Sequence, residues 1–109
     1  MWSVTKDYDI QSLLEEERPV LIFKHSYRCS ISSMALQRIE RIHKEISESA
    51  NFVLVDVIKQ RDFSLKIAKY FNIKHESPQI IFYNRGTVQF TDSHMNIKSS
   101  KVLDYLVNY

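Results

Sequence analysis

A short apolar strand that leads directly into an amphipathic helix is the feature that most constrains the fold of this chain. Residues Val20–Phe23 form an uninterrupted apolar run, which is typical of a buried β-strand. One long helix is predicted from about Ser30 to Ser49, because apolar residues recur there at spacings of three and four. These apolar positions are Ile31, Ala35, Ile39, Ile42 and Ile46. A second strand, rich in β-branched residues, is predicted over 52–57, so the order strand, helix, strand indicates a right-handed parallel βαβ unit.

Two further helices are predicted on either side of this unit. Asp9 is the expected N-cap of a short helix that ends near Arg18-Pro19. Asp62 is the expected N-cap of another helix, which follows the second strand. The apolar residues on one face of that helix are Phe63, Ile67, Ala68 and Phe71.

The last third of the chain predicts a hairpin and a closing helix. Pro78 opens the run Gln79–Tyr83, a strand that tolerates proline only at its start. Asn84-Arg85-Gly86 provides turn residues, after which 87–90 returns as the hairpin partner. A helix over about Ser99–Asn108 ends the chain. The predicted fold class is therefore α/β, with a central mixed four-stranded sheet (βαβ plus a C-terminal ββα) flanked by helices.

Composition indicates one soluble domain, residues 1–109, in a reducing compartment. The chain has a single cysteine and hence no internal disulfide, and its apolar runs are too short to cross a bilayer. The first residues lack the basic-then-apolar pattern of a signal peptide, so a cytoplasmic location is expected. The net charge of +2 comes from mixed acidic and basic residues, which disfavours nucleic acid as a partner. No membrane partner is expected either, and we expect a monomer.

Cys29 is the main candidate for chemistry. It falls in the loop that leaves the first strand, at or just before a helix N-terminus, where unpaired N–H groups and the helix dipole favour a thiolate. Functional residues of open sheets gather beyond the carboxyl ends of parallel strands, which is the same place. The alternative is an inert, buried small hydrophobe, and the polar residues around the cysteine disfavour it. Ser32 stands where a Cys-x-x-Cys enzyme has its second thiol.

This arrangement resembles the thioredoxin fold over nearly the whole chain. The resemblance rests on the strand-loop-Cys-helix unit, on the aspartate-containing strand segment Val55-Asp56-Val57, and on the segment Ile73–Phe82. It implies that Pro78 is the cis-proline that opens the third core strand and faces the active cysteine.

The loop Lys24–Ser32, together with Glu76–Gln79, more specifically resembles the YtxJ-type family of monothiol bacilliredoxins. The resemblance implies a thiol–disulfide oxidoreductase that removes bacillithiol from mixed disulfides on cytosolic proteins, with Cys29 as the catalytic residue. It also implies S-bacillithiolated proteins as partners, bacillithiol as a co-substrate with no bound cofactor, and recycling by bacillithiol or a bacillithiol disulfide reductase. The chain departs from dithiol thioredoxins at Ser32, and from monothiol glutaredoxins because Ser30, and no glycine, follows the cysteine.

Three neighbours of the cysteine are candidates for supporting its thiolate. Ser32 either hydrogen-bonds the Cys29 sulfur or is an ordinary first-turn hydroxyl. His25 either tunes or protonates a leaving thiolate, or is a strand-end residue at the surface, which is the favoured interpretation. Arg28 either pairs with a carboxylate of an anionic small thiol or is an exposed loop cation.

The substrate-binding candidates are Tyr27, Ser77 and Pro78. Tyr27 is expected to shape the entrance to the site. Ser77 and Pro78 are expected to offer backbone atoms to an extended substrate segment, as the family resemblance implies. No metal site is expected, because the remaining histidines lack metal-ligand spacing. They are His43, His75 and His94.

Two other functions stay open at this point. The chain could be a non-catalytic thioredoxin-like interaction module or redox sensor, whose cysteine is only a target of S-thiolation. Metallocofactor carriage between two chains through Cys29 is the weakest hypothesis, since the glycine motifs of monothiol glutaredoxins are missing.

Overall fold

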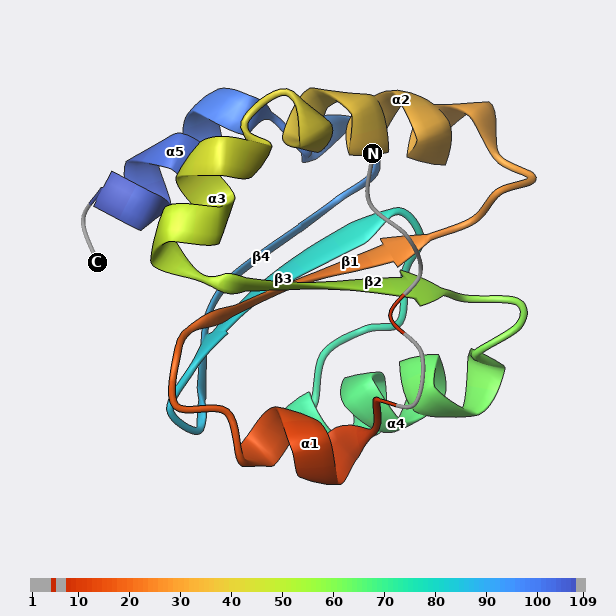
Figure 1. The fold of residues 1–109 in the computed structure, drawn as a ribbon. Coiled ribbons are helices and arrows are strands. Elements are labelled where there is room, and N and C mark those ends of the chain that lie inside the picture. Colours follow the sequence, from red (N-terminus) through yellow and green to blue (C-terminus); the bar gives the residue numbers. More distant parts are fainter. Residues whose placement is uncertain (1–4, 6–7, 108–109) are drawn as a thin grey trace.

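A four-stranded mixed sheet with the strand order β2-β1-β3-β4 runs through the middle of the structure (Figure 1). The computed structural model describes Thr5 and residues 8–107. The strands are β1 (Val20–His25), β2 (Asn51–Asp56), β3 (Gln79–Asn84) and β4 (Thr87–Ser93). β1 is parallel to β2 and antiparallel to β3, and β3 is antiparallel to β4. The predicted mixed sheet, a βαβ unit followed by a hairpin, is confirmed.

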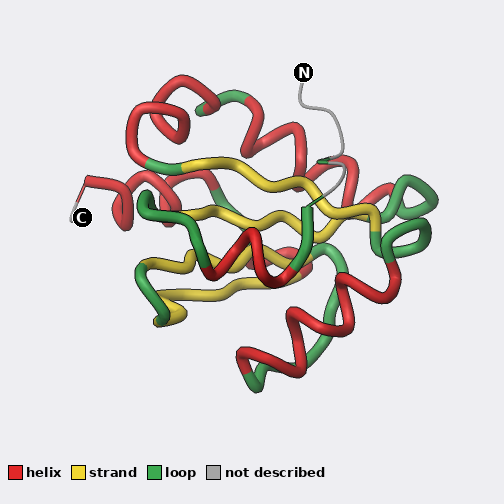
Figure 2. The backbone as a smooth tube through the Cα atoms, turned by 60° about the horizontal axis from the view of Figure 1, so that its bottom comes forward, coloured by secondary structure: helices red, strands yellow, loops and turns green. Residues whose placement is uncertain are grey.

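Helices cover both faces of this sheet. α2 (Ser30–Glu40), α3 (His43–Ser49) and α5 (Ser99–Val107) lie on one face, and α1 (Ile10–Leu14) and α4 (Arg61–Phe71) lie on the other (Figure 1). Figure 2 shows the same arrangement, with helices on either side of the strands. Among the described residues, no helix is both long enough and apolar enough to cross a membrane.

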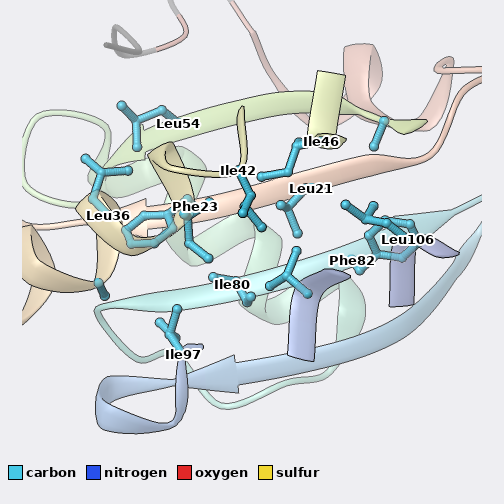
Figure 3. Packing of buried hydrophobic residues seen from close by; sticks show 14 residues of the cluster. Leu21, Phe23, Leu36, Ile42, Ile46, Leu54, Ile80, Phe82, Ile97 and Leu106 are labelled. Atoms are coloured by element: carbon cyan, nitrogen blue, oxygen red, sulfur yellow. The ribbon is translucent and has the colours of Figure 1, made fainter. Parts of the chain in front are cut away.

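Strand β1 is buried on both of its faces, which explains its uninterrupted apolar sequence. Leu21 and Phe23 point into a core shared with α2, α3 and α5, whereas Val20 and Ile22 point into a second core beneath α1 and α4. Figure 3 shows the first of these cores, in which Phe23 and Leu21 of β1 lie with isoleucines and leucines of the surrounding elements. The sheet is therefore held from both sides, and its strand ends form a rigid base for the loops beyond them.

The single helix predicted over 30–49 is wrong, because the chain breaks it into α2 and α3. Ile42 leaves the helical region, with φ −112° and ψ 27°, and caps the second segment. α2 packs on β1, whereas α3 packs on α5 and β2, so one straight helix would not serve both contacts. The break keeps Ile39, Ile42 and Ile46 in the same core.

One of the two predicted helix caps is confirmed and the other is wrong. Asp9 caps α1, since its carboxylate accepts the Ser12 N–H at 2.9 Å. Asp62 does not cap α4, because that helix begins one residue earlier, at Arg61, and Gln60 is the N-cap residue. Asp62 instead lies in the first turn, where a carboxylate still interacts favourably with the helix dipole.

The hairpin turn is formed by two residues of positive φ. Arg85 (φ 46°) and Gly86 (φ 86°) connect Asn84 to Thr87, which pair with one another. Positive φ at both central residues is typical of a type I′ turn, the form that matches the twist of the flanking strands. The partner strand continues to Ser93, beyond its predicted end. The closing helix is described as far as Val107, so its predicted last residue, Asn108, lies outside the described residues.

Candidate active site

Cys29 is the N-cap residue of α2, which confirms its predicted place at the start of a helix. Its backbone is extended, and its carbonyl accepts the Ser33 N–H at 3.1 Å. Its own N–H donates to the Ser26 carbonyl at 3.2 Å, which closes the turn between β1 and the helix. The free thiol is partly exposed and forms no capping bond with the first turn of α2. The N–H groups of that turn are therefore directed toward the cysteine without a side-chain cap.

The loop before β3 lies at the same end of the sheet as the cysteine loop. Lys24 of β1 pairs with Gln79 of β3, so Pro78 lies alongside the last residue of β1. The peptide bond between Ser77 and Pro78 is cis, as the resemblance implied. Pro78 is buried, and its carbonyl accepts the His94 N–H at 2.9 Å. The cysteine loop and the proline loop therefore leave the sheet at one end.

Ser77 presents unused hydrogen-bonding groups at this edge. Within the described part of the chain, neither its N–H nor its carbonyl pairs with another residue. Its hydroxyl is buried and has no hydrogen-bond partner among the described residues. Buried polar groups are nearly always paired, so this residue is an exception.

His25 is buried, with 1% of its surface exposed, so its interpretation as a surface residue is wrong. The rings of Tyr27 and Phe23 lie 4.2 and 6.0 Å from the imidazole, centroid to centroid. Burial lowers the pKa of His25 below its ordinary value, and the negative charges of Asp56 and Glu40 partly oppose this shift. Burial therefore favours the neutral form of the imidazole.

Ser32 links this histidine to the cysteine loop. Its hydroxyl oxygen lies 2.6 Å from Nδ1 of His25 and accepts the Ser26 N–H at 3.0 Å. Ser32 is completely buried. A hydrogen bond from its hydroxyl to the Cys29 sulfur is not among those of the described residues, so that role stays a prediction.

Sequence reasoning missed the pair formed by His25 and Ser32. The signal was available, because side chains alternate along a strand. His25 must then share a face with Leu21 and Phe23, which is the face that α2 covers. The apolar run ends at Phe23, however, and the register with β2 is what extends the strand and buries His25.

Three large apolar side chains near the cysteine in the sequence are exposed. Tyr27, Ile31 and Met34 are 56%, 42% and 51% exposed, and they lie in the cysteine loop and on the outer side of α2. Arg28 is also exposed, next to Cys29. Exposed apolar side chains that gather around a functional group are typical of a contact surface for another protein.

Sequence reasoning also missed a polar cluster around a buried lysine on the opposite face of β1. Lys24 has no exposed surface, and its Nζ donates to the Ser64 carbonyl at 2.9 Å. The same atom lies 3.2 Å from Nδ1 of His75. Burial lowers the pKa of Lys24 to about 8. The pKa of His75 is lowered by burial and by the charges of Lys24 and Arg61. Within Thr5 and residues 8–107, no three His, Cys, Asp or Glu side chains gather as metal ligands.

These features define a class of protein. A cysteine at the start of the helix after β1, a cis-proline before β3, and the mixed sheet beneath them are the features of a thioredoxin-fold thiol protein. The chain is similar to a solved structure described as a candidate oxidoreductase with a thioredoxin fold, at 30% identity and a TM-score of 0.74, over 86% of this chain and 82% of that one. Thioredoxins of Fasciola hepatica (18% identity, TM-score 0.66, 91% and 89% covered) and Malassezia sympodialis (19%, 0.69, 92% and 84%) share the fold.

The sequence pattern of monothiol bacilliredoxin BrxC matches residues 3–102. The chain therefore belongs to the monothiol bacilliredoxin family, and it is a thiol oxidoreductase of the thioredoxin fold. Its single cysteine agrees with a monothiol mechanism.

Proposed function

We propose that this protein removes bacillithiol from mixed disulfides on cytosolic proteins, with Cys29 as the attacking thiol. The observation that carries the proposal is the pairing of a lone thiol at the start of α2 with a buried serine at the position of a resolving thiol. Membership of the monothiol bacilliredoxin family supports the identity of the small thiol.

The reaction consists of two thiol–disulfide exchanges. The Cys29 thiolate attacks the bacillithiol sulfur of the mixed disulfide, and the client's sulfur leaves as a thiolate that takes up a proton. Cys29 then carries bacillithiol in a new mixed disulfide. A second bacillithiol thiolate attacks the bacillithiol sulfur of this disulfide, releases Cys29, and forms bacillithiol disulfide, which a bacillithiol disulfide reductase reduces.

The second exchange requires an outside thiol because residue 32 has none to offer. A hydroxyl does not form a disulfide, so Ser32 cannot expel the bacillithiol that Cys29 has accepted. Its hydroxyl is also held by His25 and Ser26. Bacillithiol therefore serves as both the group removed and the reductant.

The surroundings of Cys29 suit a segment of a client protein whose cysteine is capped, that is, carries bacillithiol in a mixed disulfide. Tyr27, Ile31 and Met34 offer apolar surface to the client. Ser77 offers an N–H and a carbonyl that no other described residue uses, so an extended client segment can add to this edge through backbone hydrogen bonds. Arg28 is exposed beside the thiol, where its guanidinium can pair with a carboxylate of the small thiol.

The test is a transfer experiment read by intact mass. The reduced protein is incubated with a client that carries bacillithiol on a single cysteine, and the expected product is a bacillithiol adduct on Cys29 with release of the free client thiol. Cys29→Ser must form no adduct, and Ser33→Ala, a neighbouring helix variant, serves as the matched control. Clients capped with glutathione or coenzyme A show which small thiol is preferred.

Two outcomes would contradict the proposal. One is the absence of an adduct on the wild-type protein while the client stays capped. The other is equal removal of bacillithiol by Cys29→Ser. If, in addition, iodoacetamide alkylates Cys29 no faster than it alkylates a free cysteine, the alternative of an interaction module or redox sensor is favoured.

A further inference from the structure

We propose that the contact between Lys24 and His75 positions the proline loop, residues 72–78, to bind a client segment, and so favours protein clients over small disulfides. The inference rests on the proposed function, and it concerns the binding of the client rather than the reactivity of Cys29. Lys24 and His75 act through the loop and are therefore positioning residues.

The proline loop, which joins α4 to β3, is held in place mainly by side chains (Figure 1). Among the described residues, 74–77 form no backbone–backbone hydrogen bond. Nε2 of Gln79 donates to the Lys74 carbonyl at 2.9 Å, and Nζ of Lys24 lies 3.2 Å from Nδ1 of His75. The first of these contacts comes from β3, which follows the loop directly. The second joins the loop to β1, the strand that leads to the cysteine.

The direction of the hydrogen bond between Lys24 and His75 follows from the chemistry of the two groups. Burial lowers the pKa of Lys24 to about 8, so the ammonium form still predominates at pH 7. An ammonium has hydrogens to donate and no lone pair, so Nδ1 of His75 is the acceptor and the ring carries its hydrogen on Nε2. Burial and the charges of Lys24 and Arg61 lower the pKa of His75, which favours this neutral form.

The lysine end of the contact is fixed in the protein interior. Lys24 has no exposed surface, and its Nζ also donates to the Ser64 carbonyl of α4 at 2.9 Å. The hydroxyl oxygen of Ser64, another completely buried residue, lies 3.4 Å from the same Nδ1 of His75. A buried ammonium that moved away would lose its partners at a large cost in free energy. His75 itself is exposed, so the contact fastens a surface loop to a rigid group.

This contact lies close to the groups that the proposed function assigns to the client. His75 precedes Ser77 by two residues, and the N–H and carbonyl of Ser77 are the groups expected to bind an extended segment. Lys24 lies in β1, which leads to Cys29. A shift of the loop would therefore move the client-binding groups relative to the thiol while leaving the thiol in place. A small disulfide has no extended segment and would not be affected.

The test is a pair of substitutions at His75, an exposed position where both variants should fold. His75→Leu removes the acceptor nitrogen, whereas His75→Asn keeps an acceptor oxygen at a similar distance from the backbone. The steady-state rate of bacillithiol removal is measured with a protein client that carries bacillithiol on a single cysteine. His75→Leu should raise KM about tenfold with little change in kcat, the result expected when binding alone is weakened. His75→Asn should recover most of the loss.

Two further variants show whether the two residues act together. Lys24→Met should raise KM as His75→Leu does, and the double variant should be no worse than either single variant, because one contact is lost in all three. If Lys24→Met fails to fold, the pair of substitutions at His75 still decides the matter. His43→Leu is the matched control, since it removes an exposed histidine from α3, on the other face of the sheet, and its KM should equal that of the wild-type protein.

Measurements without a protein client separate positioning from general damage to the site. Reduced Cys29 is mixed with bacillithiol disulfide, from which it accepts one bacillithiol and releases the other as a thiol, and separately with iodoacetamide. Both rates should be the same in His75→Leu and in the wild-type protein. In addition, the ¹⁵N resonance of Nδ1 of His75 should shift in Lys24→Met, because its hydrogen-bond donor is lost.

Three results would overturn this inference. They are an unchanged KM in His75→Leu, an equal rise in KM for His75→Leu and His75→Asn, and a loss that extends to bacillithiol disulfide and iodoacetamide. Failure of the proposed function would look different, because the wild-type protein itself would then remove no bacillithiol from the client.

Discussion

Nζ of Lys24 lies 3.2 Å from Nδ1 of His75, and this contact joins the strand before the cysteine to the loop before the cis-proline. The same ammonium donates to the Ser64 carbonyl of α4 at 2.9 Å. One buried cation therefore connects β1, α4 and the proline loop. It lies on the opposite face of the sheet from His25, so buried polar groups lie on both sides of β1 next to the site.

The first prediction concerns Lys24 and alkaline pH. Its pKa is lowered to about 8 in the folded protein from an ordinary value of 10.5, so the unfolded chain binds more protons between these two values. The free energy of unfolding should therefore rise as pH increases through this window, by at most about 3 kcal/mol in total. Urea unfolding at pH 7.5, 8.5 and 9.5 measures the rise, with the range kept below the ordinary titration of tyrosine.

Lys24→Met is the matched control for this prediction. Methionine fills similar volume without a charge, so the part of the pH dependence that comes from Lys24 should vanish. A rise of the same size in the variant and in the wild-type protein would show that another group is responsible.

The second prediction concerns the hairpin turn. Arg85 adopts a positive φ of 46°, which asparagine tolerates better than arginine, so Arg85→Asn should stabilise the protein by about 0.5–1 kcal/mol. Gly86→Ala should destabilise it by about 1 kcal/mol through backbone strain alone, since the added Cβ would meet no atom within 4 Å beyond its chain neighbours. Thermal unfolding of the two variants should give shifts of opposite sign, and shifts of the same sign would contradict the type I′ assignment.

The third prediction concerns the core beneath α2. Ile39 is completely buried, and Ile39→Ala should lower the free energy of unfolding by about 2–5 kcal/mol through lost burial and a residual cavity. Ile58→Ala removes the same atoms at a position that is 48% exposed, and its effect should stay within about 1 kcal/mol. Comparable losses in the two variants, by urea titration, would refute this packing.

The fourth prediction concerns Arg28 and the small thiol. Arg28→Gln should weaken the rate of reaction with a bacillithiol mixed disulfide about two- to fivefold, the size expected for an exposed ion pair, and should leave stability unchanged. The loss should shrink at high salt, because exposed charges are screened. Arg85→Gln, at the far hairpin, is the control, and an equal loss in that variant would point to overall charge.

Much of the fold follows from local signals that the structure retains. The apolar run of β1 and its following helix predict the βαβ unit, and Pro78 marks the start of β3 because proline is confined to such positions. The place of Cys29 at the helix start follows from the same apolar run and helix, because the cysteine lies between them. These features depend on periodicity and backbone chemistry, both of which are written in a few adjacent residues.

The features that sequence reasoning missed depend on contacts between distant elements. Lys24 and His25 are polar, so the strand was expected to end before them, but pairing of His25 with Asp56 extends it and buries both side chains. The break at Ile42 likewise reflects the different partners of α2 and α3. Neither register nor helix packing is encoded in a single segment.

Because the residue in the first turn of α2 is a completely buried serine, the mixed disulfide that Cys29 forms in the proposed reaction is not resolved within the protein. A protein with a second thiol at that position would release the bound small thiol by forming an internal disulfide. Here the mixed disulfide on Cys29 persists until a free small thiol attacks it. Its abundance should therefore follow the ratio of oxidised to reduced small thiol in the cell. The fraction of chains that carry the small thiol on Cys29, measured by intact mass, would then report how oxidised the small-thiol pool is.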